Sequence, residues 1–400
     1  MTYVHIEHIT AQEILDSRGK PTIEVEISGG GYTAKAAVPS GKSTGVNEAV
    51  ELRDEDGGVS CVLKTIESEI TPKLIGTEFA SQKEIDTLLR GIDGIENFSR
   101  IGANSALPIS IGALRLAAMQ RGMELSDHIA DVAGMQKSKQ APRLYVNVIN
   151  GGAHADFRLP FQEYMIVPEH ESVHDAYAYI VKAIEILGEL IEERYGNVPL
   201  GDEGGYSFVS EMIEEPFELV SLAIEKAGGN AHIAIDVAAS AFFEGGGYRV
   251  NGERMTKKAL GGLYEKLVQA FPLKSIEDPF EEHDAESFTA LHAAFPDILI
   301  VGDDFTVTDP ERIAEVAKRE AANAVIIKPN QIGTVSDTLE AIAVAHDVGW
   351  KTIISHRSGE TLDTFIADLA VGTGAYAMKA GSPLQDVRRV KYERLLEIVG

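Results

Sequence analysis

Six apolar runs in the second half of the chain each end at an ionisable residue. The runs are AHIAID, LKSIED, ILIVGDD, AVIIK, KTIISH and GAYAMK, and they end at Asp236, Glu277, Asp303, Lys328, His356 and Lys379. Longer stretches with helical periodicity separate these runs, a pattern typical of βα units around a parallel sheet. Because the C-terminal ends of parallel barrel strands meet at one face, we expect the six side chains to converge on one mouth.

The spacing of the runs distinguishes between two α/β folds. Most of them follow one another at about the length of one βα unit, and about 250 residues of such units is the size of a (β/α)8 barrel. A doubly wound open sheet is the alternative fold, but no glycine-rich phosphate fingerprint follows the first strand. We therefore predict that residues 144–400 form a (β/α)8 barrel.

The first third of the chain has a mixed pattern. TIEVEI (22–27) and YTAKAAV (32–38) flank GGG (29–31) and predict a β-hairpin, and apolar positions at helical spacing follow it. We expect three or more helices packed on that sheet, in an α+β domain of residues 1–133. The polar stretch GMQKSKQAPR, residues 134–143, has the composition of a linker.

The charge of the chain excludes some classes of partner. The sequence holds 62 acidic and 36 basic residues, a net charge of −26 at pH 7, which opposes binding to nucleic acids and anionic membranes. No apolar stretch approaches the roughly 18 residues of a membrane span, and the N-terminus lacks the pattern of a signal peptide. The single cysteine, Cys61, fits a reducing compartment. We expect a cytoplasmic protein with neither nucleic acid nor membrane as partner.

The charged strand ends indicate metal-assisted chemistry. Asp236, Glu277 and Asp303 would form an all-oxygen site suited to Mg²⁺. Each acid alone has an ordinary alternative as the N-cap of the next helix, but three acids at one mouth repel one another without a cation. Lys328 ends the next run, and a neutral lysine beside a metal ion is a base. This combination indicates enolate formation, because divalent ions stabilise the charge left when a carbon acid loses its proton.

Three further segments carry polar residues suited to a site. GDEGG offers Glu203 as a general acid, although a glycine-rich acidic loop is more often only a turn. Gln162 and Glu163 interrupt a strand-like apolar run, and the alternative is that they face solvent. SHRSGET supplies Arg357 and Ser358, a pair suited to binding an anion that also occurs on plain surfaces.

Taken in order, the motifs of the chain resemble those of the enolase family. They are EILDSRGKPTIEVEI, AAVPSGKSTG, EAVELRD, NGGAH, FQEYMI, GDEGG, DVAAS, SIEDPF, VGDDFTVT, IIKPNQIGT, SHRSGETLDTFIADLAVG and MKAG, and they span nearly the whole sequence. The resemblance implies an N-terminal α+β domain and a barrel that begins ββαα. It further implies a glycolytic lyase that interconverts 2-phosphoglycerate and phosphoenolpyruvate, with two Mg²⁺ ions per active site, the second bound with the substrate. A small phosphorylated carboxylate and a second copy of the chain are the implied partners.

The resemblance also implies a role for each matching residue. Asp236, Glu277 and Asp303 would bind the first Mg²⁺, and Ser43 would help to bind the second together with the substrate phosphate. Lys328 would remove the α-proton and Glu203 would protonate the departing hydroxyl. The other positions would support Glu203 (Glu163 and Gln162), hold the substrate carboxylate (Lys379), hold the phosphate (Arg357 and Ser358) or complete the closed site (His154 and His356).

Four segments depart from the family pattern. The stretch after Arg53 and Asp54 is shorter than usual, and AGSPLQDVRRV after Lys379 lacks part of the usual arginine pattern. The other two segments lie near the proposed substrate. Lys42 stands where the family usually has alanine, and residues 157–160 replace a normally polar segment. Both adjoin the mouth, so they bear on the substrate more than on the chemistry. Lys42 is a candidate substrate-binding residue, or else a solvated loop lysine. The alternative functions are an enolase paralogue acting on a phosphonate or carboxyphosphono compound, as carboxyphosphonoenolpyruvate synthase does, and a non-catalytic binding or scaffold role.

Overall fold

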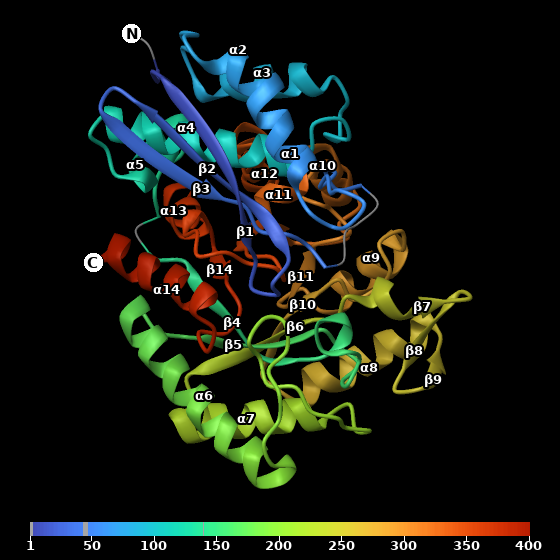
Figure 1. Cartoon of the computed structure of the whole chain (residues 1–400). Helices are drawn as coiled ribbons and strands as arrows, with labels where there is room; N and C mark the ends of the chain where they lie inside the picture. The colour runs from blue at the N-terminus through green and yellow to red at the C-terminus, as the bar shows by residue number, and fades with distance from the viewer. Residues whose placement is uncertain (1–2, 43–46, 139) are drawn as a thin grey trace.

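A computed structural model of the protein describes residues 3–42, 47–138 and 140–400. It contains a small α+β part at the N-terminus and a closed eight-stranded barrel at the C-terminus (Figure 1). Both predicted folds are therefore confirmed.

The N-terminal part is built on a three-stranded antiparallel sheet of order β1-β2-β3. Its strands are β1 (His8–Leu15), β2 (Pro21–Gly29) and β3 (Tyr32–Ala37). In β2, Ile23, Val25 and Ile27 alternate with polar residues and are fully buried, so one face of the sheet packs on the core. The predicted hairpin is β2–β3, and β1 is an additional strand that the sequence analysis did not indicate.

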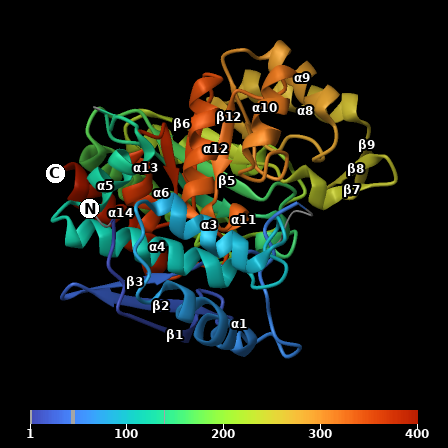
Figure 2. The ribbon, with the colours of Figure 1, turned by 90° about the horizontal axis from the view of Figure 1, so that it is seen from above.

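Helices follow the sheet in the N-terminal part, and some of them pack on its strands. They are α1 (Ser60–Thr65), the π-helical turn η1 (Ile66–Ile70), α2 (Thr71–Leu74), α3 (Gln82–Asp93), α4 (Ala103–Gln120) and α5 (Leu125–Ala133). Helix α4 contacts β2 and β3 on one side and barrel helices on the other, so nearly all of its positions are buried (Figure 2). The N-terminal part is thus fixed against the barrel through α4.

The barrel begins with two antiparallel strand pairings and continues with parallel ones, in the order β4-β5-β6-β10-β11-β12-β13-β14. The strands are β4 (Arg143–Asn150), β5 (Glu163–Pro168), β6 (Ala231–Asp236), β10 (Leu273–Glu277), β11 (Leu299–Gly302), β12 (Ala324–Ile327), β13 (Lys351–Ser355) and β14 (Ala377–Lys379). Helices α6 (Val173–Tyr195) and α7 (Glu215–Ala227) lie between β5 and β6, which confirms the ββαα start.

Other helices surround the remaining strands. They are α8 (Lys257–Ala270), α9 (Ala285–Ala294), α10 (Pro310–Lys318), α11 (Pro329–Ile332), α12 (Val335–Asp347), α13 (Phe365–Gly372) and α14 (Asp386–Val399). Two short 3-10 turns, η2 (Gly152–Ala155) and η3 (Ala239–Phe242), and a small sheet of β7 (Phe243–Glu244), β8 (Gly247–Val250) and β9 (Glu253–Met255) complete the elements. Apolar side chains such as Met165, Val301 and Ile326 fill the barrel interior, so only its mouth is open to ligands.

Two boundaries bear on the sequence predictions. Helix α5 ends at Ala133 and β4 begins at Arg143, and we propose to place the division between the domains in this interval, with 134–143 as the linker. None of the helices in the described parts of the chain combines the length and apolar character of a membrane span.

Candidate active site

The mouth of the barrel gathers most of the side chains singled out from the sequence. Strands β6, β10 and β14 end on Asp236, Glu277 and Lys379, and the other three predicted residues directly follow their strands. A cavity of about 20 Å³ lies between them, enough for one water-sized group. It is lined by His154, Gln162, Glu163, Glu203, Asp236, Ala238, Asp278, Asp303, Asp304, Lys328, Ser355, His356, Arg357, Ser358 and Lys379.

Two predicted residues within the described parts of the chain are not in that lining. Glu277 is buried and forms an ion pair with Lys379, whose Nζ lies 2.8 Å from Glu277 Oε2. Lys42 lies at the rim, and Ser43 falls outside the described residues. The alternative that Gln162 and Glu163 face solvent is excluded, because both side chains are buried.

Lys379 is the centre of a buried group of carboxylates. Its Nζ lies 2.8 Å from Glu277 Oε2, 3.1 Å from Glu163 Oε2 and 3.4 Å from Asp236 Oδ2. Burial would lower the pKa of Lys379, but these carboxylates hold it well above its ordinary value. The repulsion expected among the acids is thus relieved by an ammonium group within the site. Gln162 Nε2 donates a hydrogen bond to Asp236 Oδ2 (3.0 Å), which fixes that carboxylate.

Lys328 forms an ion pair with Asp303, and both residues line the cavity. Burial alone would lower the pKa of Lys328, but the Asp303 carboxylate raises it above its ordinary value. In this state the lysine is therefore an ammonium. Gln331 Nε2 donates to the other oxygen of Asp303 (3.1 Å), so both oxygens of this carboxylate are engaged.

Glu163 and Glu203 form an acid pair in which the two pKa values move apart. Burial and the charge of Glu203 raise the pKa of Glu163 well above its usual range. Burial also opposes ionisation of Glu203, but His154, His356 and a hydrogen bond from Glu163 hold its pKa well below the usual range. Asn147 Nδ2 donates to Glu203 Oε2 over 2.9 Å. Of the two acids, Glu163 is therefore the more readily protonated and Glu203 the more readily ionised.

The geometry also fixes the state of His356. Its Nδ1 contacts the Arg388 guanidinium, which can only donate, so Nδ1 is an acceptor. Burial lowers the pKa of His356 well below its usual value, which agrees with a neutral ring. The proton then sits on Nε2, 3.6 Å from Glu203 Oε1, and His154 Nδ1 lies 3.3 Å from the same oxygen.

The N-terminal domain reaches the site at Arg357 and Ser358. Arg357 Nη1 forms a buried ion pair with Glu48 Oε2 at 2.8 Å and donates to Asn330 Oδ1 at 2.9 Å. Ser358 Oγ accepts hydrogen bonds from the backbone N–H of Lys42 (2.9 Å) and from Arg18 Nη1 (3.3 Å). The predicted anion-binding pair is therefore held by residues from both domains.

Several residues at the mouth were missed by the sequence analysis. Asp278 and Asp304 share with Asp303 a set of carboxylate oxygens that lie within 4.8 Å of one another. Burial and the Asp303 charge raise the pKa of Asp304 to about 7. The acidic pairs in SIEDPF and VGDDF carried this signal, because each strand end holds two adjacent acids. Asn147, Glu48 and Arg18 had no comparable signal.

The backbone around the mouth is strained. Ala238 and Asp278 follow β6 and β10 with φ of 47° and 42°, and Val307 and Thr308 have φ of 46° and 57°. Residues with side chains rarely adopt this left-handed region, and such strain concentrates at functional sites. In the GDEGG turn, a Cβ on Gly201 would lie 2.4 Å from Asn150 Cβ, so only glycine allows this close packing.

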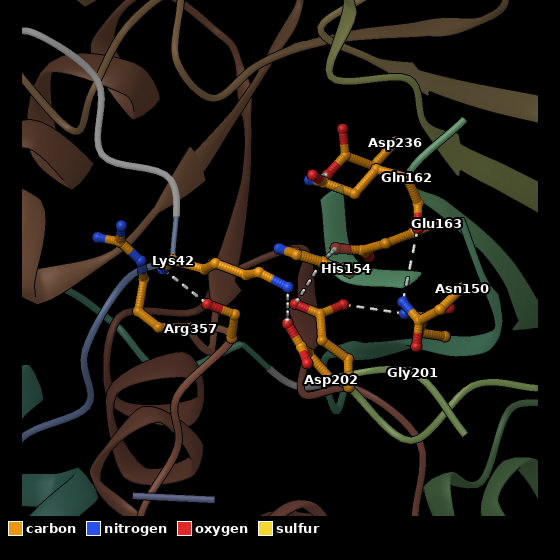
Figure 3. Close-up of polar contacts among 12 residues, drawn as sticks. Lys42, Asn150, His154, Gln162, Glu163, Gly201, Asp202, Asp236 and Arg357 are labelled. Carbon is orange, nitrogen blue, oxygen red and sulfur yellow. Dashed lines mark hydrogen bonds and ion pairs between the residues drawn. The ribbon is translucent and has the colours of Figure 1, made fainter. Parts of the chain in front are cut away.

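Lys42 contacts the GDEGG loop, residues 201–205, which carries Glu203 and is called the acid loop below. Figure 3 shows its side chain extending toward Asp202, and its Nζ lies 2.8 Å from Asp202 Oδ2. Lys42 is exposed to solvent and is not among the residues that line the cavity. It joins the N-terminal domain to the loop that carries Glu203.

Comparisons with known proteins agree with this geometry. Residues 6–129 match the family model described as the enolase N-terminal domain, and residues 138–400 match the enolase C-terminal TIM barrel domain. A curated protein of Mycobacteroides abscessus named enolase is 41% identical, over 98% of this chain and 94% of its own length. Proteins named enolase from Methanopyrus kandleri and Mastigamoeba balamuthi are also 41% identical, each over 98% of this chain and 95% of their own length.

Proposed function

The chain belongs to the enolase family, and on this premise we propose that it catalyses the reversible dehydration of 2-phosphoglycerate to phosphoenolpyruvate. It is a lyase of the enolase type. One observation carries the mechanism: the cavity is lined by a lysine after β12 and by a carboxyl pair that includes Glu163 of β5, and these two strands are opposite each other in the order of the barrel. Elimination of water needs this separation, since one group must take a proton from carbon and another must give one to the leaving hydroxyl.

We assign the two halves of the reaction to these groups. Lys328 removes the α-proton as a neutral amine, so its ion pair with Asp303 must open and its ammonium must first release a proton to solvent. Glu203 delivers the proton to the departing hydroxyl, and Glu163 supplies it through their shared hydrogen bond. His356 and His154 keep Glu203 oriented toward the cavity.

Substrate binding is assigned to the positive side chains. Lys379 holds the substrate carboxylate, because it is a buried ammonium beside two of the proposed metal-binding carboxylates, Asp236 and Glu277. Arg357 and Ser358 hold the phosphate, since a guanidinium and a hydroxyl match phosphate oxygens. The cavity is water-sized, so the substrate must displace the ion pairs that now close it.

The family is metal-dependent, and we propose Mg²⁺ as the metal, with two ions per active site. Asp236, Glu277 and Asp303 would hold the first ion, because they are buried carboxylates matched by positive charge, and oxygen ligands suit Mg²⁺. Ser43, which lies outside the described residues, would help to hold the second together with the phosphate. When bound, Mg²⁺ stabilises the negative charge that forms as the α-proton leaves.

The substrate assignment is tested by following phosphoenolpyruvate absorbance with 2-phosphoglycerate and Mg²⁺. We expect rapid turnover at catalytic enzyme concentrations, and none when Lys328 is replaced by alanine. A carboxyphosphono compound converted faster than 2-phosphoglycerate would support the paralogue instead, an alternative that the names of the relatives do not favour. Turnover of neither compound would favour a binding role.

We further propose that the protein is a cytoplasmic homo-oligomer. A groove of about 1070 Å³ runs between the N-terminal sheet and α14, with Leu15 and Leu362 on its lining about two-thirds exposed. Apolar side chains of this size on a groove suit a second copy of the chain. Sedimentation at micromolar concentration should show an oligomer, and a monomer would refute this. For the compartment, the support is the single unpaired Cys61, and the test is cell fractionation.

A further inference from the structure

A short segment of the N-terminal domain is attached to the barrel directly beside the proposed phosphate site. Ser40 N–H donates to Gly359 O (2.8 Å) and Gly359 N–H donates to Ser40 O (2.9 Å), a two-bond antiparallel bridge. Lys42 follows on the same segment, and its N–H donates to Ser358 Oγ at 2.9 Å. The hydroxyl of Ser358 is therefore oriented in part by the backbone of Lys42.

The Lys42 side chain adds a second attachment on a different barrel loop. Its Nζ lies 2.8 Å from Asp202 Oδ2, with 40% of the lysine side chain and 24% of the aspartate side chain exposed (Figure 3). Lys42 thus donates a backbone hydrogen bond to the Ser358 hydroxyl and forms an ion pair with the acid loop through its side chain.

The acid loop is held in place by hydrogen bonds to the rest of the barrel, independently of Lys42. Asp202 N–H donates to His154 O (3.0 Å), and Arg388 Nη2 donates to Asp202 O (3.2 Å). Neither bond involves Lys42, so the loop and Glu203 stay in place without the ion pair. The ion pair therefore fixes Lys42 to the acid loop, and the loop does not depend on Lys42.

We propose that Lys42 is a positioning residue that sets affinity for the substrate phosphate, through its ion pair with Asp202 and its backbone bond to Ser358. The proposal rests on the proposed function, in which Ser358 binds phosphate. Because Lys328 and Glu203 are held by other contacts, loss of the ion pair raises KM and leaves kcat nearly unchanged. For a partly exposed ion pair the expected increase in KM is about 1.5- to 5-fold.

The test compares Lys42→Met, Asp202→Asn and the double variant, with Lys73→Met as a control that removes the same charge from an exposed site on α2. Both single variants should raise the KM for 2-phosphoglycerate, and the double variant should be no worse than the more affected single. Lys42→Arg should restore the wild-type value, and Lys73→Met should leave it unchanged.

The outcomes separate positioning from other roles of the lysine. If Lys42 only attracts the anionic substrate at long range, Asp202→Asn lowers KM, which would overturn the proposal. If Lys42 binds the substrate itself, its effect persists in the Asp202→Asn background, which would also overturn it. Amide hydrogen exchange over residues 40–42 gives a readout without substrate. It should be about 1.5- to 5-fold faster in Lys42→Met, and equal exchange would refute positioning even if the chain did not act on 2-phosphoglycerate.

Discussion

The ion pair between Glu48 and Arg357 joins the two domains inside the protein. Arg357 Nη1 lies 2.8 Å from Glu48 Oε2, and the two side chains are only 4% exposed. Burial would lower the pKa of Arg357, but Glu48 raises it, so the guanidinium keeps its charge. Glu48→Ala would therefore leave a charged guanidinium buried without its carboxylate partner.

The loss of stability in Glu48→Ala is expected to be large because the ion pair is buried. Removing one partner of a buried ion pair destabilises a protein by about 3–5 kcal/mol. Asn330 Oδ1 still accepts from Arg357 Nη1, so we expect the lower end, about 3 kcal/mol in the free energy of unfolding. Glu48→Gln keeps an acceptor oxygen but loses the charge, and about 1.5 kcal/mol is expected.

Urea unfolding of the full chain measures these differences. The control is Glu244→Ala, which breaks an exposed ion pair with Arg249 whose side chains are 57% and 56% exposed. Such a pair contributes below about 1 kcal/mol. If Glu48→Ala destabilised the protein no more than Glu244→Ala, the idea that the buried pair holds the domains together would be wrong.

Two further predictions concern pH and metal. Arg121 Nη1 can only donate to His128 Nδ1 (3.1 Å), and burial lowers the pKa of His128 to about 4. Because the unfolded chain takes up this proton near pH 6.5 and the folded protein does not, stability should fall by about 1–2 kcal/mol, after allowance for screening, between pH 6.5 and 4. Urea titrations should show that the stability of His128→Gln does not fall in this way. If the free energies of unfolding of the wild type and His128→Gln changed in parallel with pH, the assignment to His128 would be wrong. Asp236→Asn should lower Mg²⁺ affinity at least about tenfold, or about 1.4 kcal/mol, in calorimetric titrations, and activity that resists a chelator would oppose a metal role.

The residues at the strand ends could be predicted from the sequence because the C-terminal ends of all parallel barrel strands lie at the same mouth. An apolar run that stops at an acid or a lysine fixes both the strand and the functional side chain, as at Asp236 and Lys379. Strand β1 was missed because the apolar residues of HITAQEIL stop alternating with polar ones after Ala11 and most of its side chains are exposed. It becomes a strand by pairing with β2.

The rest of the site depends on contacts between distant segments. Glu48 and Arg18 reach the mouth only because the N-terminal domain docks on the barrel, which no local pattern encodes. Asn147 sits in an apolar strand, where its position gave no hint of the bond to Glu203. The opposite pKa shifts of Glu163 and Glu203 likewise follow from burial and proximity, which periodicity does not reveal.

The division of roles between Lys328 and Glu203 is tested most directly by exchange of the substrate α-proton with solvent. The measurement follows exchange into 2-phosphoglycerate in deuterated buffer with Lys328→Ala and with Glu203→Gln. Lys328→Ala should abolish exchange, because the base is gone, whereas Glu203→Gln should retain exchange while dehydration is lost. Equal loss of exchange in both variants, or exchange that survives in Lys328→Ala, would contradict the proposed mechanism.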